Sequence, residues 1–191
     1  SQSGASVNTL ASGTNAVLLI ELNGTSAGLN ANGLTISAGG STVRGLVINR
    51  FTGSGDGIRL LTLGGNTITG NFIGTNPAGT SGLGNDDGVT ISNDSTANTI
   101  GGTTPALRNL ISANRDDGLD FGSGATGNVV QGNLIGTNAS GEGDLGNTSE
   151  GLRIDTSGNT IGGTVAGARN VISGNDLSGV LLRADNNVVQ G

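Results

Sequence analysis

The sequence predicts an all-β fold in which the chain coils into a parallel β-solenoid with three short strands in each turn. The stretch NTIGGTTPALRNLISAN at residues 98–114 returns almost unchanged as NTIGGTVAGARNVISGN at 159–175. A related pair alternates with it, NTITGNFIGTN at 66–76 and NVVQGNLIGTN at 128–138. Short apolar runs separated by Gly and Asn oppose helix. Self-similarity at a period of about 30 residues is typical of stacked turns, whose strands lie about 4.8 Å apart.

Each turn is expected to supply one strand to each of three series. The first begins with glycine and alternates apolar with polar residues: GIRLL at 57, GVTIS at 88, GLDFG at 118, GLRID at 151 and GVLLR at 179. The second runs TVR at 42, NTI at 66, NTI at 98, NVV at 128, NTI at 159 and NVV at 187. The third runs LVI at 46, FIG at 72, NLI at 109, NLI at 133 and NVI at 170.

Alternation along these strands assigns side chains to the inside or the outside of the coil. Two interior columns are expected, one formed by Ile48, Ile73, Ile111, Ile135 and Ile172, the other by Val43, Ile68, Ile100, Val130, Ile161 and Val189. On the first strands the outward positions are Arg59, Thr90, Asp120, Arg153 and Leu181.

Asparagine recurs where the coil must turn a corner. Asn71, Asn109, Asn133 and Asn170 fall at one matching position, and Asn76, Asn114, Asn138 and Asn175 at another. Asparagine tolerates the left-handed backbone of a tight corner, and its amide both donates and accepts hydrogen bonds. We therefore expect ladders of stacked asparagine amides, with a structural role.

The whole chain, residues 1–191, is interpreted as one domain. Residues 41–191 carry the regular repeats, and residues 1–40 are expected to form irregular first rungs, with a cap or irregular rung over 1–14 and strands within 16–24 and 33–37. The last copy, NNVVQG, stops after a second strand. The final rung is therefore expected to be open, so that the chain is a segment of a longer array or stacks end to end with another copy.

Composition excludes several functions. There is no Cys, no His and no Tyr, and all eight basic residues are Arg, so disulfides, thiolate metal sites, imidazole bases and lysine nucleophiles are impossible. Zinc would have only carboxylates to bind it. A net charge of −6 disfavours a nucleic-acid partner. No apolar run approaches the roughly 20 residues of a membrane helix, and no signal sequence is recognisable.

Residues 41–191 contain a succession of four motifs: N-x-I-x-G-N-x-I-G-T-N, L-G-N, N-T-I-G-G-T and R-N-[VL]-I-S-x-N. This succession resembles the right-handed parallel β-helix repeats of large bacterial surface and secreted proteins. The corner residues Asn71 and Asn133 resemble the asparagine ladder of the pectate-lyase type. The resemblance implies an extracellular or cell-surface location. The resemblance is specific for the fold. It does not identify the function, because this architecture hosts polysaccharide lyases, hydrolases, epimerases, tailspikes and adhesins.

If the chain is an enzyme, the resemblance implies that its outward first-strand column carries the chemistry. Lyases of that kind combine calcium-binding Asp with a basic residue, and the matching positions are Arg59, Asp116, Asp117, Asp120 and Arg153. The alternative is ion pairing between rungs, with Asp120 beside Arg153 and Asp155 beside Arg183. The missing His, Lys and Tyr and the scarcity of aromatic side chains favour the structural interpretation.

A column of acids precedes the first strands: Asp56, Asp87, Asp117 and Glu150. At about 5 Å, neighbouring carboxylates repel by about 3 kcal/mol at an effective dielectric constant of 20. Side chains splayed into solvent, or Arg59 or Arg115 leaning over the acids, would relieve this repulsion. A cation bound by the four acids would also relieve it, and oxygen ligands of this kind suit calcium.

These observations favour a non-enzymatic, extracellular β-helix segment of a longer repeat protein that serves as a stalk or adhesion module. Its expected partner is a polysaccharide or another component of a cell surface. A polysaccharide-acting enzyme, lyase or hydrolase, is the alternative. A flat, ion-paired outward column would favour the stalk, and a groove with unpaired carboxylates would favour the enzyme.

Overall fold

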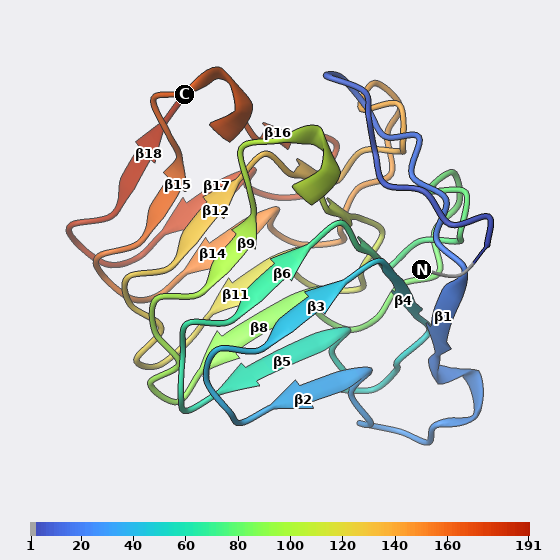
Figure 1. Cartoon of the computed structure of the whole chain (residues 1–191). Helices are drawn as coiled ribbons and strands as arrows, with labels where there is room; N and C mark the ends of the chain where they lie inside the picture. Colours follow the sequence, from blue (N-terminus) through green and yellow to red (C-terminus); the bar gives the residue numbers. More distant parts are fainter. Residues whose placement is uncertain (1–2) are drawn as a thin grey trace.

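The computed structural model describes residues 3–191 as a right-handed parallel β-helix built from three parallel sheets (Figure 1). The first sheet contains β2 (Leu34–Ile36), β5 (Ile58–Leu61), β8 (Val89–Ser92), β11 (Leu119–Phe121), β14 (Leu152–Ile154) and β17 (Val180–Leu182). The second contains β3 (Thr42–Arg44), β6 (Thr67–Thr69), β9 (Thr99–Gly101), β12 (Val129–Gln131), β15 (Thr160–Gly162) and β18 (Val188–Gln190). The third contains β1 (Ile20–Asn23), β4 (Leu46–Asn49), β7 (Phe72–Ile73), β10 (Leu110–Ile111), β13 (Leu134–Ile135) and β16 (Val171–Ile172).

The expected register is confirmed. In the third sheet Ile111 is paired with both Ile73 and Ile135, and in the second sheet Val130 is paired with Ile100 and Ile161. These aliphatic columns meet the inward residues of the first sheet in one continuous core, where Ile111 is fully buried. The strands expected within residues 16–24 and 33–37 are β1 and β2, which pair in register with β4 and β5.

Asparagine ladders stabilise all three corners, one more than the sequence suggested. In the ladder of Asn71, Asn109, Asn133 and Asn170, each side-chain amide donates to the next side-chain carbonyl at 2.9–3.2 Å, as expected. A further ladder links Asn66, Asn98, Asn128, Asn159 and Asn187. In the sequence these residues are recognisable only as the first residues of strands.

At the remaining corner the expectation was wrong for two residues. The ladder runs through Asn85, Asn114, Asn147 and Asn175, and it omits Asn76 and Asn138. Because a loop is inserted before this corner in every second rung, Asn76 and Asn138 instead begin the loops, where their side chains accept from the N–H groups of Thr80 and Ser140.

A second apolar cluster lies outside the coil. The outward residues of the third sheet, Val47, Phe72, Leu110 and Leu134, are buried, and Ala16, Leu18, Ala139 and Val171 pack against them. The cover includes an N-terminal arm, residues 5–18, whose two limbs pair at an antiparallel bridge between Ser6 and Val17. The sequence did not predict this arm, and Ser1 and Gln2 of the expected cap lie outside the described residues.

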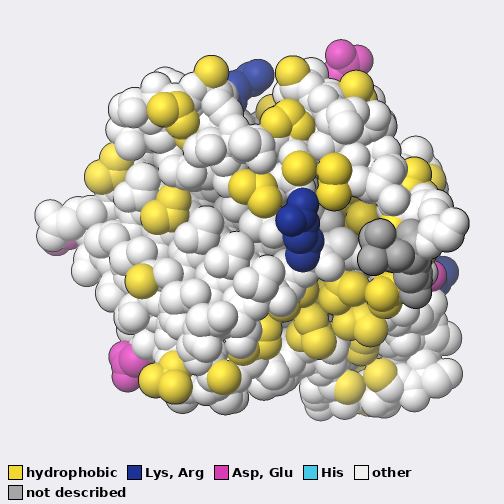
Figure 2. All heavy atoms as spheres, in the orientation of Figure 1, with side chains coloured by type: hydrophobic (Ala, Val, Ile, Leu, Met, Phe, Trp, Pro, Cys, Tyr) yellow, Lys and Arg dark blue, Asp and Glu magenta, His cyan; other side chains and the backbone are white. Residues whose placement is uncertain are grey.

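Arg108 fixes the tip of the arm. Its guanidinium donates to the carbonyls of Leu10, Ala11 and Gly13 at 3.2, 3.0 and 2.6 Å. Figure 2 shows hydrophobic side chains gathered beside one basic side chain over the region where the arm and β4 lie in Figure 1. The apolar surface of this region includes Val7 and Val17, which are 49% and 45% exposed.

Three short 3-10 turns complete the described structure: η1 (Gly24–Ser26), η2 (Pro105–Leu107) and η3 (Ala166–Ala168). The last two lie in matching loops two rungs apart, directly before Arg108 and Arg169. Over residues 3–191 no helix has the length and hydrophobicity needed to cross a bilayer.

Candidate functional site

The predicted acidic column lies along the edge of the first sheet, one residue before the glycine that begins each strand. Glycine is required there because the rungs approach closely: a Cβ on Gly57 would lie 2.7 Å from the carbonyl oxygen of Gly88. The N–H of Gly57 in turn donates to the carbonyl of Asp87 (2.9 Å). This close stacking places the acids of successive rungs directly above one another.

The acids form a ladder of their own. The side chain of Asn32 accepts from the N–H of Asp56 at 2.9 Å. Higher in the column, Oδ1 of Asp87 accepts from the N–H of Asp117 (2.8 Å), and Oδ1 of Asp117 accepts from the N–H of Glu150 (2.9 Å). These carboxylates therefore accept from backbone N–H groups as the ladder asparagines do, except that an ionised carboxylate has no proton to donate to the next rung.

Burial changes the acidity of this ladder. Loss of solvent raises the pKa of Asp87 from 3.8 to about 8, against hydrogen bonding from the backbone of Asp117. Burial is also the main reason why the pKa of Asp117 rises to about 7 and that of Asp56 moves upward. The pKa of Glu150 is lowered, chiefly by a hydrogen bond from the Ser149 hydroxyl. At neutral pH the middle of the ladder therefore retains protons.

The expected relief of repulsion is only partly confirmed. Arg59 does lean over the column, with Nη1 3.3 Å from Oδ2 of Asp56. Splaying into solvent does not occur at Asp56 and Asp117, each of which is 2% exposed. At Asp117, whose pKa rises to about 7, a hydrogen bond from the N–H of Glu150 and a partly retained proton reduce the repulsion, whereas at Asp56 the guanidinium of Arg59 reduces it.

The outward column of the first sheet is mostly paired. Arg153 contacts Asp155 of its own rung at 2.8 Å, and Arg183 lies 3.8 Å from the other oxygen of Asp155, as expected for that pair. Asp120 lies beside Arg153 in the register, but the expected ion pair between them is not formed, because the guanidinium turns to Asp155. Oδ1 of Asp120 is consequently buried without a hydrogen-bond partner.

The five residues considered for catalysis thus have different surroundings. Arg59 and Arg153 are engaged in ion pairs, and Asp117 uses one carboxylate oxygen on the backbone. Asp116 is exposed beside Asp117, and half-buried Asp120 keeps one free oxygen. Burial raises the pKa of Asp120, and the nearby Arg153 opposes that shift.

One group of acids is close enough to share a cation. Asp87, Asp116 and Asp117 each offer a carboxylate oxygen, and these oxygens lie within 4.8 Å of one another. The group keeps Asp87 and Asp117 of the predicted set and has Asp116 in place of Asp56 and Glu150. Calcium takes six to eight oxygen ligands. Three carboxylates, two of them already accepting from the backbone, would need carbonyl oxygens or water to complete its shell.

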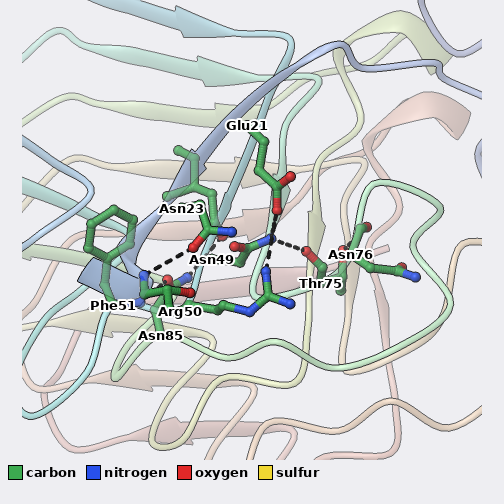
Figure 3. Close-up of polar contacts among 10 residues, drawn as sticks. Glu21, Asn23, Asn49, Arg50, Phe51, Thr75, Asn76 and Asn85 are labelled. Carbon is green, nitrogen blue, oxygen red and sulfur yellow. Dashed lines mark hydrogen bonds and ion pairs between the residues drawn. The ribbon is translucent and has the colours of Figure 1, made fainter. Parts of the chain in front are cut away.

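A polar network that sequence reasoning missed lies at the end of the third sheet (Figure 3). The buried Asn49 donates to Oε1 of Glu21 (2.8 Å) and to the carbonyl of Thr75 (3.0 Å), while Arg50 lies 3.7 Å from Glu21. Oδ1 of Asn49 has no partner. A buried asparagine within an apolar strand is the only signal that the sequence offers for this network.

Comparison with known proteins gives no match: no protein family, no curated protein and no solved structure is significantly similar to this chain.

Proposed function

We propose that this chain is a non-enzymatic β-helix segment of a longer extracellular repeat protein, which serves as a stalk and adheres to a polysaccharide or another cell-surface component. The observation that carries the proposal is the use of the outward first-sheet residues. Arg59, Arg153 and Arg183 are paired with acids, and Asp87 and Asp117 accept from backbone N–H groups of the next rung. The Arg183–Asp155 pair and the two backbone hydrogen bonds join successive rungs, and the side chains committed to all of these contacts are not free to attack a substrate.

The asparagine ladders support a mechanical role. At each corner, amide hydrogen bonds run from rung to rung in addition to the strand pairing. A solenoid with continuous ladders and a continuous aliphatic core resists bending and presents loops at a regular spacing. Rigid display of loops is what an adhesive stalk requires.

The alternative is a polysaccharide-acting enzyme, and one observation favours it. Asp120 keeps an unpartnered buried oxygen next to Arg153, and Asp87 and Asp117 have pKa values in the range of a general base or acid. Such a reaction would use Asp120 or Asp117 to remove a proton and Arg59 or Arg153 to stabilise the developing negative charge.

A paired assay separates the two proposals. The purified chain is incubated with neutral and acidic polysaccharides, with and without calcium, while sedimentation with insoluble glycan measures binding and reducing-end release measures cleavage. We expect binding without product. Cleavage that disappears in Asp120→Asn or Arg153→Gln and persists in the exposed control Asp185→Asn would establish the enzyme instead.

A further inference from the structure

A hollow of about 260 Å³ lies on the outer face of the third sheet, between the two matching loops that contain η2 and η3. Its floor is apolar and includes Leu134 and Val171, which are neighbours in the strand register. Arg108 and Arg169 line it from the ends of the two loops, and the arm tip closes one side. The first sheet, with its acids, is a different face of the coil.

The hollow carries positive charge without compensation. Its lining, within residues 3–191, contains no Asp or Glu. Arg108 donates to the carbonyls of Leu10, Ala11 and Gly13, and through Nε to that of Gly132 (3.0 Å). Four of its five N–H groups are therefore used, all on neutral acceptors that leave the charge in place.

Arg169 occupies the same position two rungs later, before the ladder residue Asn170 as Arg108 is before Asn109. It is exposed, and in the part of the chain that the structure describes it has no hydrogen bond or ion pair through its side chain. Burial, and then the charge of Arg169, lower the pKa of Arg108, as expected for two guanidinium groups near one another with no anion between them.

We infer that this hollow is a binding site for a small organic carboxylate, held by the guanidinium of Arg169 over an apolar floor of Leu134 and Val171. A planar carboxylate matches the two parallel N–H groups of one guanidinium, and Arg108 contributes charge and its remaining N–H. The Thr103 and Thr104 side chains on the lining offer further hydroxyl groups. The volume is just below the 300–1,000 Å³ typical of drug-sized ligands, which suits an acid with a single ring.

Titration calorimetry with benzoate tests the site, with the neutral isostere benzamide and inorganic phosphate as comparison ligands. We expect benzoate to bind with a dissociation constant that is lower than that of benzamide or phosphate by about tenfold, the ratio that about 1.4 kcal/mol produces. Arg169→Gln should raise the dissociation constant for benzoate by a similar factor. Arg115→Gln, which removes another exposed arginine outside the hollow, should change the affinity less than about twofold. Arginine Nε–H resonances should show Arg169 shifting upon addition of benzoate.

Three results would overturn the inference: no detectable benzoate binding at low ionic strength, equal binding of benzamide, or equal effects of Arg169→Gln and Arg115→Gln. Binding of phosphate without binding of benzoate would show that the hollow attracts anions but does not recognise carboxylates, and would also contradict the inference. Capture of an uncharged peptide with the arm-tip sequence NTLASGT, dependent on Arg169 and without benzoate binding, would identify a peptide groove instead. Unchanged melting temperatures of both variants would show that the comparison concerns binding only.

Discussion

At the scale of single residues, the choice between Asn and Asp at a corner determines how the coil responds to pH. An asparagine accepts from one rung and donates to the next at every pH. Asp87 and Asp117 form part of a similar ladder, in which each carboxylate accepts a hydrogen bond from a backbone N–H of the next rung. These carboxyl groups can donate a hydrogen bond only when they are protonated. Their buried surroundings, which raise both pKa values, make the protonated form the better fit.

The pH dependence of stability follows from the direction of these shifts. The folded pKa of Asp87, about 8, exceeds its ordinary value of 3.8, so its contribution to stability is complete below the ordinary value and is lost as the pH rises through 8. The melting temperature should therefore fall between about pH 4 and pH 8. Asp87→Asn should raise it by several degrees at pH 8 and flatten the fall. Scanning calorimetry of this variant beside the exposed control Asp185→Asn measures both effects, and a native melting temperature that rises over this interval would contradict the assignment.

The aliphatic columns should contribute more to stability than a single ladder amide. Ile111→Ala empties a fully buried position between Ile73 and Ile135 and should cost about 2–5 kcal/mol. Asn133→Ala should cost about 1–3 kcal/mol, because the buried N–H of Asn109 loses its side-chain acceptor and the carbonyl of Ile100 loses a donor. Urea unfolding is the measurement, with Leu177→Ala, 64% exposed, as the control. A harmless Ile111→Ala would mean that the inside and outside of the third sheet are exchanged.

At the scale of elements, the sequence was informative where the repeat is regular. Strand positions, the interior columns and one complete asparagine ladder could all be read from the spacing of Ile, Val and Asn, because each residue contacts its own counterpart in the next rung. The prediction failed at Asn76 and Asn138, where an inserted loop moves the corner residue to Asn85 and Asn147. It also missed the arm, whose contacts with Arg108 have no counterpart in the repeat.

The arm gives a prediction about local opening. Arg108→Ala removes the three bonds to the arm carbonyls, so hydrogen exchange over residues 5–18 should accelerate by about tenfold or more, while exchange in β10 and β13 stays slow. Arg169→Ala is the matched control, because it removes the equivalent arginine that has no contact with the arm carbonyls. Equal protection of the arm in both variants would show that apolar packing alone holds it.

The acidic ladder also gives a prediction about calcium. If Asp87, Asp116 and Asp117 hold the ion with carbonyl or water oxygens, millimolar calcium should raise the melting temperature of the native chain above pH 8, where Asp87, with its pKa of about 8, is mostly ionised. The double variant Asp87→Asn, Asp117→Asn should not respond. A native melting curve that is the same in chelator and in excess calcium would leave the column as a ladder that binds protons and no metal.

At the scale of the whole molecule, the chain is a stack with a different use for each face. The first sheet carries the acids and most of the ion pairs, the second sheet is nearly uncharged, and the third sheet carries the arm and the arginine-lined hollow. The sequence predicted which residues share a column, but not which neighbour each charged side chain selects. Arg153 reaches Asp155 instead of Asp120 because guanidinium direction depends on rotamers, which a repeat pattern does not specify.

The two ends of the stack present unpaired strand edges, and they carry the last prediction. β1, β2 and β3 are edge strands at one end, and β16, β17 and β18 at the other. Val188 and Val189 are 45% and 54% exposed there, so apolar surface accompanies the open hydrogen-bonding groups. Exposed edges of this kind favour pairing with another strand. We expect end-to-end association that grows with concentration in sedimentation velocity experiments.

Val189→Lys should weaken that association, because the position continues the interior column of Ile161 and would place a charge between two stacked coils. Leu63→Lys adds the same charge at an exposed leucine, 64% exposed, on the side of the coil, and should leave association unchanged. A native chain that stays monomeric up to millimolar concentration would contradict end-to-end stacking. Equal loss of association in both variants would mean that general charge repulsion, and not the open rung, controls it.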